Sequence, residues 1–196
     1  MPLLSFLVFV MITSFTPGPN NIMAMAFANK HGLSNTFQFC LGVGVGFLTI
    51  TGLSSLFNIV LTNIMPMIEF PLTILSVGYM LYLAIKILTS KEDNNDKEEE
   101  NKRNLFLIGV FLQFVNPKGI LFGITVVATY ILPYYSSYVS YFLFSLFLGM
   151  VGIMSTFSWA LFGSAFQKIL QQYRQSFNVV MALLLVYSAI SILVHS

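Results

Sequence analysis

The stretch Thr16-Pro17-Gly18-Pro19-Asn20-Asn21 lies in the middle of the first apolar segment, which extends over residues 3–28. Neither proline can donate a backbone hydrogen bond, and a proline ring clashes with the preceding turn of a helix. The residue before a proline is also pushed away from helical backbone angles. The helix must therefore break here, at about the depth of a membrane midplane. Unpaired backbone groups are tolerated there only where protein or a polar cavity covers them, so the stretch predicts a site.

The composition indicates an integral membrane protein. Of the 196 residues, 57% are hydrophobic and 8% are charged, and the mean hydropathy is +0.83. A soluble domain carries about 25% charged residues. The first apolar segment is too long for the core of a signal peptide and has no charged residue before it, so we expect it to be a retained span. The chain has no basic stripe, which argues against a nucleic-acid partner.

Six apolar segments are long enough to cross a bilayer, which takes about 20 residues of helix. They are residues 3–28, 35–61, 71–89, 105–132, 138–164 and 176–194. We expect Pro66 and Pro71 to bracket a turn between the second and third segments. Residues 90–104 read SKEDNNDKEEENKRN, with six acidic and four basic residues and no apolar one. Such a stretch cannot bury apolar surface, so it is expected to be a solvated linker.

Basic residues fall almost entirely on one side of these six spans. Eight of the nine lie at the ends of the first, third and fifth segments: Lys30, Lys86, Lys91, Lys97, Lys102, Arg103, Lys168 and Arg174. The ninth, Lys118, is inside the fourth segment. The positive-inside rule then places the linker 90–104 in the cytoplasm and both termini outside it. We therefore expect a multi-pass protein of the plasma membrane.

The linker divides the single transmembrane domain, residues 1–196, into halves at residues 1–89 and 105–196. Because each half has an odd number of spans, the two halves would cross the membrane in opposite directions. The segments YLAIKIL at 82–88 and YSAISIL at 187–193 are identical at five of seven positions. The expected fold is therefore an all-α membrane protein of six helices, arranged as two inverted three-helix repeats.

The interruptions of the helices correspond as well. Pro17 lies in the middle of the first segment, and Pro117 lies in the middle of the fourth, within Asn116-Pro117-Lys118-Gly119. Inverted repeats with matching broken helices are typical of secondary transporters that bind substrate between the repeats. Amides freed at a helix N-terminus suit a carboxylate, and freed carbonyls suit an ammonium group. The pattern thus allows a zwitterionic amino acid as the substrate.

Lys118 is the one formal charge that the sequence places near the membrane centre. A lysine there costs several kcal/mol unless it is paired or hydrated. We expect it to contact the carbonyls freed at the first break, to face a water-filled cavity, or to bind an anionic group of the substrate. It can also exchange a proton, which makes the proton the coupling ion to consider. Alternatively, Lys118 has only a structural role, in which it extends to the membrane surface or pairs with another group. Asn20, Asn21 and Asn116 would then only form hydrogen bonds with the freed backbone groups.

The sequence shows no group of residues that would catalyse a reaction. His31 and His195 lie at segment ends, and no acidic residue lies deep enough to work in a catalytic pair. There is no metal-ligand cluster and no phosphate-binding loop. We therefore expect no catalysis, no cofactor and no metal. A membrane interaction protein without transport is the alternative from another class, and a homo-oligomer stays open.

Four motifs together resemble the LysE/RhtB family of amino-acid exporters. They are TPGPNNI at 16–22, GVGVG at 42–46, the segment from Gly78-Tyr79 to Lys86, and QFVNPK at 113–118. The resemblance covers essentially the whole chain and implies a transporter that contains no ATP-binding element. The residues expected to bind substrate are those of the two breaks: Thr16, Pro17, Gly18, Pro19, Asn20, Asn21, Asn116, Pro117 and Lys118.

Within this family, the chain looks most like the members that export cysteine and O-acetylserine. The supporting stretches are residues 15–26, 112–116, 158–161 and 166–187. This resemblance implies secondary-active export of small neutral amino acids from the cytoplasm across the bacterial inner membrane, driven by an ion gradient. The block Asn116-Pro117-Lys118 follows the wider family pattern, so export of homoserine, threonine or homoserine lactone stays open.

Overall fold

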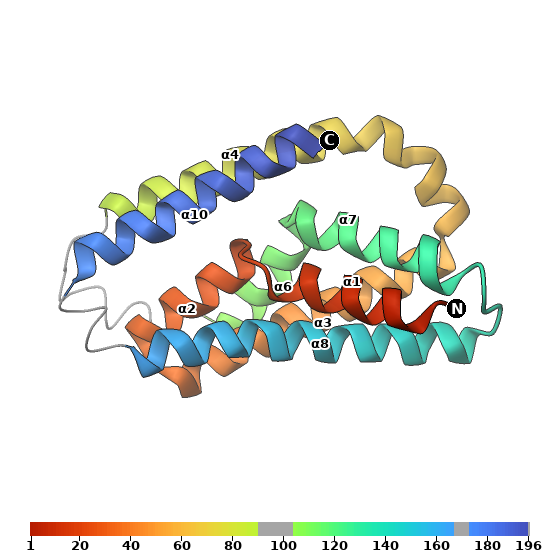
Figure 1. The fold of residues 1–196 in the computed structure, drawn as a ribbon, viewed down its shortest axis with the longest axis horizontal. Coiled ribbons are helices and arrows are strands. Elements are labelled where there is room, and N and C mark those ends of the chain that lie inside the picture. The colour runs from red at the N-terminus through yellow and green to blue at the C-terminus, as the bar shows by residue number, and fades with distance from the viewer. Residues whose placement is uncertain (90–103, 167–172, 196) are drawn as a thin grey trace.

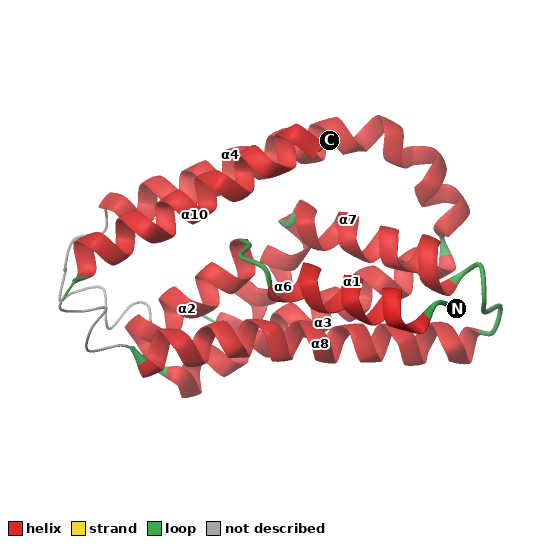
Figure 2. Ribbon diagram, in the orientation of Figure 1, coloured by secondary structure: helices red, strands yellow, loops and turns green. Residues whose placement is uncertain are grey.

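A computed structural model of the chain describes residues 1–89, 104–166 and 173–195, and it is helical throughout, with no strand in these ranges (Figures 1 and 2). The helices are α1 Leu3–Phe15, α2 Pro19–His31, α3 Leu33–Leu56, α4 Asn58–Thr89, α6 Leu105–Val115, α7 Pro117–Val126, α8 Tyr138–Ala165 and α10 Arg174–His195. A short π-helix, η1, continues α7 over Val127–Ile131. The predicted linker lies, apart from Asn104, outside the described residues.

Both predicted breaks are present. α1 and α2 meet at an angle of 48°, and α6 meets the continuous α7 and η1 at 67°. Each second half-helix begins with a proline, Pro19 in α2 and Pro117 in α7. Proline suits the first position of a helix because its missing N–H would have no partner there. The sequence thus determines where each helix stops and where it restarts.

α3 and α8 form the centre of the bundle and pack against each other (Figure 1). α3 also packs against α6 and α7, whereas α8 packs against α2 and α1. Each long helix therefore lies on the broken helix of the other half of the chain. Glycines make the closest crossings: a Cβ atom on Gly42 would overlap the carbonyl oxygen of Phe106, and one on Gly163 would overlap that of Met25.

α4 and α10 lie side by side as a separate pair along one side of the bundle (Figure 1). They join the rest through an apolar cluster that contains Ile22 of α2, Leu83 of α4 and Leu185 of α10. The predicted turn between Pro66 and Pro71 is wrong, because α4 is helical through both prolines. An interior proline removes one backbone bond and bends a helix without necessarily ending it. α4 accordingly curves strongly in its first half (Figure 1).

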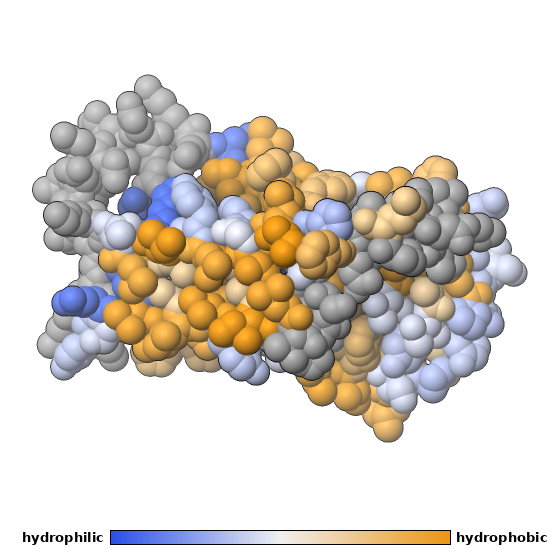
Figure 3. Space-filling model, turned by 90° about the horizontal axis from the view of Figure 1, so that it is seen from above, coloured by the Kyte–Doolittle hydropathy of each residue, from blue (hydrophilic) through white to orange (hydrophobic). Residues whose placement is uncertain are grey.

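The described helices are compatible with a membrane. α3 and α8 are each long and apolar enough to cross it, and the two bent pairs raise this number to four if each pair is one span. α4 and α10 contain shorter apolar stretches, Thr73–Thr89 and Gln175–Tyr187. Large apolar side chains are exposed along most helices, and they cover broad parts of the face seen in Figure 3. This surface suits lipid contact.

Candidate functional site

Lys118, the second residue of α7, reaches across to the break between α1 and α2. Its Nζ atom donates to Thr16 O at 3.1 Å, to Thr16 Oγ1 at 2.9 Å and to Pro17 O at 3.2 Å. A lysine ammonium has three N–H donors, and three acceptors surround this one. Of the three environments predicted for Lys118, the structure has contact with the freed carbonyls. The two breaks, about one hundred residues apart, therefore meet directly.

The other carbonyls at the end of α1 also find donors. The Asn21 amide donates to Ser14 O at 2.9 Å and to Thr16 O at 3.0 Å. From α8, Ser155 Oγ donates to Ser14 O at 2.6 Å, and Trp159 Nε1 donates to Phe15 O at 3.1 Å. Phe15 O needs such a partner because the residue four positions later is a proline without an N–H. The break is thus closed by side chains from two other helices.

A second hydrogen bond joins the two broken helices. Asn20 Nδ2 donates to Gln113 Oε1 of α6, and both side chains are buried, with 6% and 3% of their surface exposed. Gln113 in turn lies against Gly119 at the start of α7, where a Cβ atom would overlap the Gln113 amide. Gly119 therefore provides the room in which Gln113 reaches Asn20.

A cavity of about 60 Å³ lies where the breaks meet. One water molecule needs about 10–15 Å³ by this measure, so the space holds a few waters or a small ligand. Its walls come from α1, α2, α3, α6, α7 and α8: Thr13, Ser14, Gly18, Asn20, Asn21, Val43, Phe47, Gln113, Asn116, Lys118, Gly119, Phe122, Gly152, Ser155 and Thr156. Nine of these fifteen residues have polar side chains, although apolar atoms contribute most of the surface that lines the cavity.

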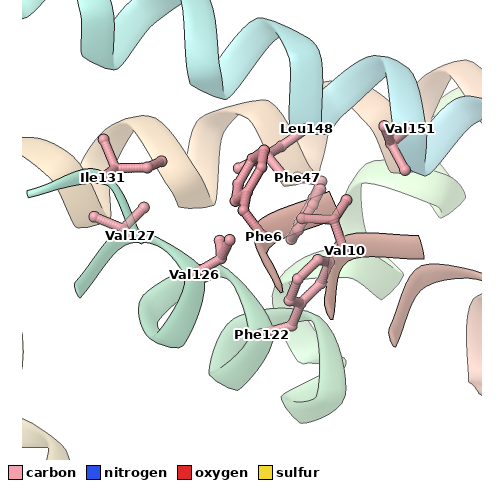
Figure 4. Close-up of a cluster of buried hydrophobic side chains, with 9 residues drawn as sticks. All are labelled: Phe6, Val10, Phe47, Phe122, Val126, Val127, Ile131, Leu148 and Val151. Atoms are coloured by element: carbon pink, nitrogen blue, oxygen red, sulfur yellow. The ribbon is translucent and has the colours of Figure 1, made fainter. Parts of the chain in front are cut away.

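Aromatic side chains form the apolar wall of this cavity. The rings of Phe47 and Phe122 stack with centroids 5.1 Å apart. Both belong to a buried cluster with Phe6, Val10 and Leu148, among others, that fills the half of the bundle containing α1 and α7 (Figure 4). The opposite half is closed by the glycine crossings of α3 with α6 and of α2 with α8. Side-chain packing therefore dominates in the half with α1 and α7, and close backbone contact dominates in the half with α2 and α6.

Three buried oxygen atoms on residues of the cavity wall have no hydrogen-bond partner within the described part of the chain. They are Ser14 Oγ, Asn20 Oδ1 and Asn116 Oδ1. Buried polar atoms without a partner are rare in folded proteins and call for an explanation. The first turns of two helices line the same cavity, since Asn20 and Asn21 lie in the first turn of α2 and Lys118 and Gly119 lie in the first turn of α7. Such ends carry partial positive charge.

The structure brings most of the predicted residues together. Thr16 and Pro17 accept from Lys118, and five predicted residues lie on the cavity wall: Gly18, Asn20, Asn21, Asn116 and Lys118. Pro19 and Pro117 are buried at the starts of α2 and α7 and do not line the cavity. Gln113 and Trp159 also take part in the site, although no sequence pattern assigns them a role there. Both residues reach the first break because α6 and α8 cross it. The sequence carries no direct signal for these helix crossings.

Comparison with known proteins defines the class. The family description "LysE type translocator" matches residues 11–196. The chain therefore belongs to the LysE family of translocators, and its apolar helices and family identify it as a multi-pass membrane protein. No solved structure matches the chain.

The names of individual relatives are more specific than the family description. The chain is 36% identical to the cysteine/O-acetylserine efflux protein of Salmonella typhimurium, over 98% of this chain and 97% of that protein. It is 37% identical to the protein of the same name from Escherichia coli O6:H1, over 96% and 95% of the two chains. These relatives are named as efflux proteins and not as enzymes. The family resemblance seen in the motifs is thereby confirmed.

Proposed function

We propose that this protein exports small neutral amino acids, cysteine and O-acetylserine among them, from the cytoplasm across the bacterial inner membrane. The observation that carries the proposal is the contact of Lys118 with the carbonyls of Thr16 and Pro17 beside a cavity that polar side chains line. Two broken helices that meet at a polar cavity are typical of secondary transporters. The names of the relatives supply the substrates.

The cavity wall suits a zwitterion. The N-termini of α2 and α7 provide amides and partial positive charge, which stabilise a carboxylate. The unpartnered oxygens of Ser14, Asn20 and Asn116 can accept from an ammonium group. A cavity of about 60 Å³ favours a small side chain. The substrate-binding residues that we propose are those of the two predicted breaks, with Thr16, Pro17, Pro19 and Pro117 acting through the backbone geometry that they impose.

The packing supports an inverted repeat, with α1 to α4 as one unit and α6 to α10 as the other. α3 lies on the broken helix of the second unit as α8 lies on that of the first, and α4 pairs with α10. In this arrangement six spans cross the membrane. The basic ends of α2 and α4 then face the cytoplasm, both termini face outward, and the proton gradient drives transport.

Export from intact cells tests the function. A bacterial strain that overexpresses the protein is loaded with labelled cysteine, O-acetylserine, threonine or homoserine, and the appearance of each compound outside is followed. We expect rapid efflux of cysteine and O-acetylserine that collapses when an uncoupler removes the proton gradient. Efflux equal to that of cells carrying an empty vector, for all four compounds, would refute the proposal.

A further inference from the structure

Each of the three unpartnered oxygen atoms can accept a hydrogen bond and lacks a donor among the residues that the structure describes. Asn20 Oδ1 and Asn116 Oδ1 are acceptors, and Ser14 Oγ can accept as well as donate. The side chains of Asn20 and Asn116 are each only 6% exposed, so bulk water does not satisfy their oxygens. A buried acceptor without a donor is less stable than a paired one. A ligand that brings N–H donors to these three atoms would recover that free energy.

Lys118 cannot be that donor. Its ammonium group already has three acceptors, which match its three N–H bonds. The side-chain amide of Asn116 has N–H donors of its own, but it does not supply the missing donor either, since neither Ser14 Oγ nor Asn20 Oδ1 has a partner within the described part of the chain. Lys118 therefore holds the two breaks together, and the donor has to come from the ligand.

The charge of Lys118 narrows the choice of ligand. Lys118 lines the cavity, so a bare cation or a simple amine would add a second positive charge beside an existing one. Like charges at short range in a poorly solvated site repel each other strongly. A zwitterion avoids this cost because its carboxylate accompanies its ammonium group. The helix N-termini of α2 and α7 provide a place for that carboxylate.

We propose that Ser14 Oγ, Asn20 Oδ1 and Asn116 Oδ1 form the subsite for the α-ammonium group of the exported amino acid. This inference rests on the proposed export function. Asn20 and Asn116 come from the two different breaks, so a bound ammonium group links both halves of the chain. If this subsite is correct, every substrate must have an ammonium group, whereas its side chain can vary.

O-acetylserine and N-acetylserine provide a stringent test because they are isomers with the same atoms. Only the first has a free ammonium group. The protein is purified and reconstituted in liposomes, and uptake of labelled O-acetylserine in exchange for internal O-acetylserine is measured at mildly acidic pH, where acyl migration is slow. We expect unlabelled O-acetylserine to compete and N-acetylserine to compete at least about 10-fold more weakly, a factor that corresponds to about 1.4 kcal/mol.

The variant Asn116→Leu probes the subsite with little risk to folding, since no hydrogen bond of the Asn116 side chain is lost. We expect it to weaken competition by O-acetylserine about 10-fold and to leave the weak effect of N-acetylserine unchanged. Asn116→Asp retains an acceptor and should keep most of the affinity. Ser145→Ala and Thr73→Val are matched controls, because each removes a buried unpartnered oxygen outside the cavity and should leave competition unchanged.

The outcomes separate the two proposals. Equal competition by both isomers, or unaltered discrimination in Asn116→Leu, would overturn the ammonium subsite while leaving export intact. Absence of O-acetylserine exchange by the wild-type protein, together with absence of cysteine exchange, would overturn the proposed function and the subsite with it.

Discussion

Lys118 Nζ lies 2.9 Å from Thr16 Oγ1 and 3.1 Å from Thr16 O, so a side chain from the second helix break closes the first. The same ammonium group is the donor to Pro17 O at 3.2 Å. Carbonyls left free in a membrane interior cost several kcal/mol each. Lys118 thus replaces part of the backbone hydrogen bonding that the two prolines remove, and it does so from the opposite half of the chain.

Replacing Lys118 by methionine, which keeps an unbranched side chain but removes the terminal ammonium group, is expected to abolish export. Pro17 O then loses the donor that it has in this structure, and we expect the free energy of unfolding to fall by about 1–3 kcal/mol. Lys118→Arg keeps the charge in a planar fork that fits three clustered acceptors poorly, so it should recover only part of the activity. Cell efflux of cysteine and thermal unfolding in detergent measure the two effects.

Lys86→Met is the matched control for this substitution. Lys86 lies in the last turn of α4 and is exposed, so the loss of its charge should change neither efflux nor unfolding. Wild-type efflux in Lys118→Met would show that the contact between the breaks is dispensable.

Trp159 is the only tryptophan of the chain and reports directly on the first break. Its indole N–H donates to Phe15 O at 3.1 Å, and Ser155, one turn earlier on α8, lines the cavity. We expect bound substrate to shift or quench the fluorescence of Trp159 in a saturable way. The titration uses purified protein with cysteine or O-acetylserine.

A relocated tryptophan separates this response from an unspecific one. In the double variant Trp159→Phe and Phe111→Trp, the indole is moved to a residue of α6 that is 65% exposed on the apolar surface. Its fluorescence should not respond to substrate. An equal response from both positions would mean that the signal does not originate at the break.

The positions of the breaks were predictable because their cause is local. Pro17, Pro19 and Pro117 lack a backbone N–H in any fold. The lengths of the spans are also predictable, because the thickness of the bilayer determines how many apolar residues a helix needs to cross it. At Pro66 and Pro71 the local sequence does not predict the outcome. They have the same local chemistry, yet α4 continues through them as a curved helix. Whether a proline ends or bends a helix depends on neighbours that the local sequence does not specify.

The partners of the freed carbonyls were only partly predictable. Contact with the first break is one of the three environments that the sequence predicts for Lys118, because a charge at that depth needs acceptors, water or an anionic group. Gln113, Ser155 and Trp159 reach the break through helix crossings that bring together residues 93 to 144 positions apart. Periodicity and composition describe one helix at a time, and they do not specify which face of α8 meets α1.

The crossing of α3 with α6 depends on two glycines. A Cβ atom on Gly42 would overlap Phe106 O, and one on Gly109 would overlap Phe39 O. Because both obstacles are backbone atoms, they cannot rotate away. We expect Gly42→Ala and Gly109→Ala each to lower the free energy of unfolding by about 1–3 kcal/mol or more, as overpacking does. Thermal unfolding in detergent and the yield of folded protein measure the effect.

Gly78→Ala provides the control for these variants. Gly78 is in α4, and a Cβ atom there would meet no atom within 4 Å. Alanine should be neutral or stabilise the helix by about 0.5–1 kcal/mol, since glycine is the poorer helix former. Comparable losses in Gly78→Ala and Gly42→Ala would contradict the close crossing.

Gly119 and Gly18 face the site from opposite breaks and should respond differently to alanine. A Cβ atom on Gly119 would overlap the side-chain amide of Gln113, which has to stay in place to accept from Asn20. A Cβ atom on Gly18 would lie 3.2 Å from Cδ and 3.3 Å from Nζ of Lys118, a flexible side chain that can move by a few tenths of an ångström. Gly119→Ala should therefore impair cysteine efflux much more than Gly18→Ala.

The double variant Gly119→Ala and Gln113→Ala distinguishes steric displacement from other effects. Gln113→Ala alone removes the acceptor of Asn20 and should reduce efflux. If Gly119→Ala acts by displacing Gln113, then adding it to Gln113→Ala should cause little further loss, because the two substitutions break the same contact. Additive losses would instead assign Gly119 a role independent of Gln113, such as close approach of the α7 backbone to the substrate carboxylate.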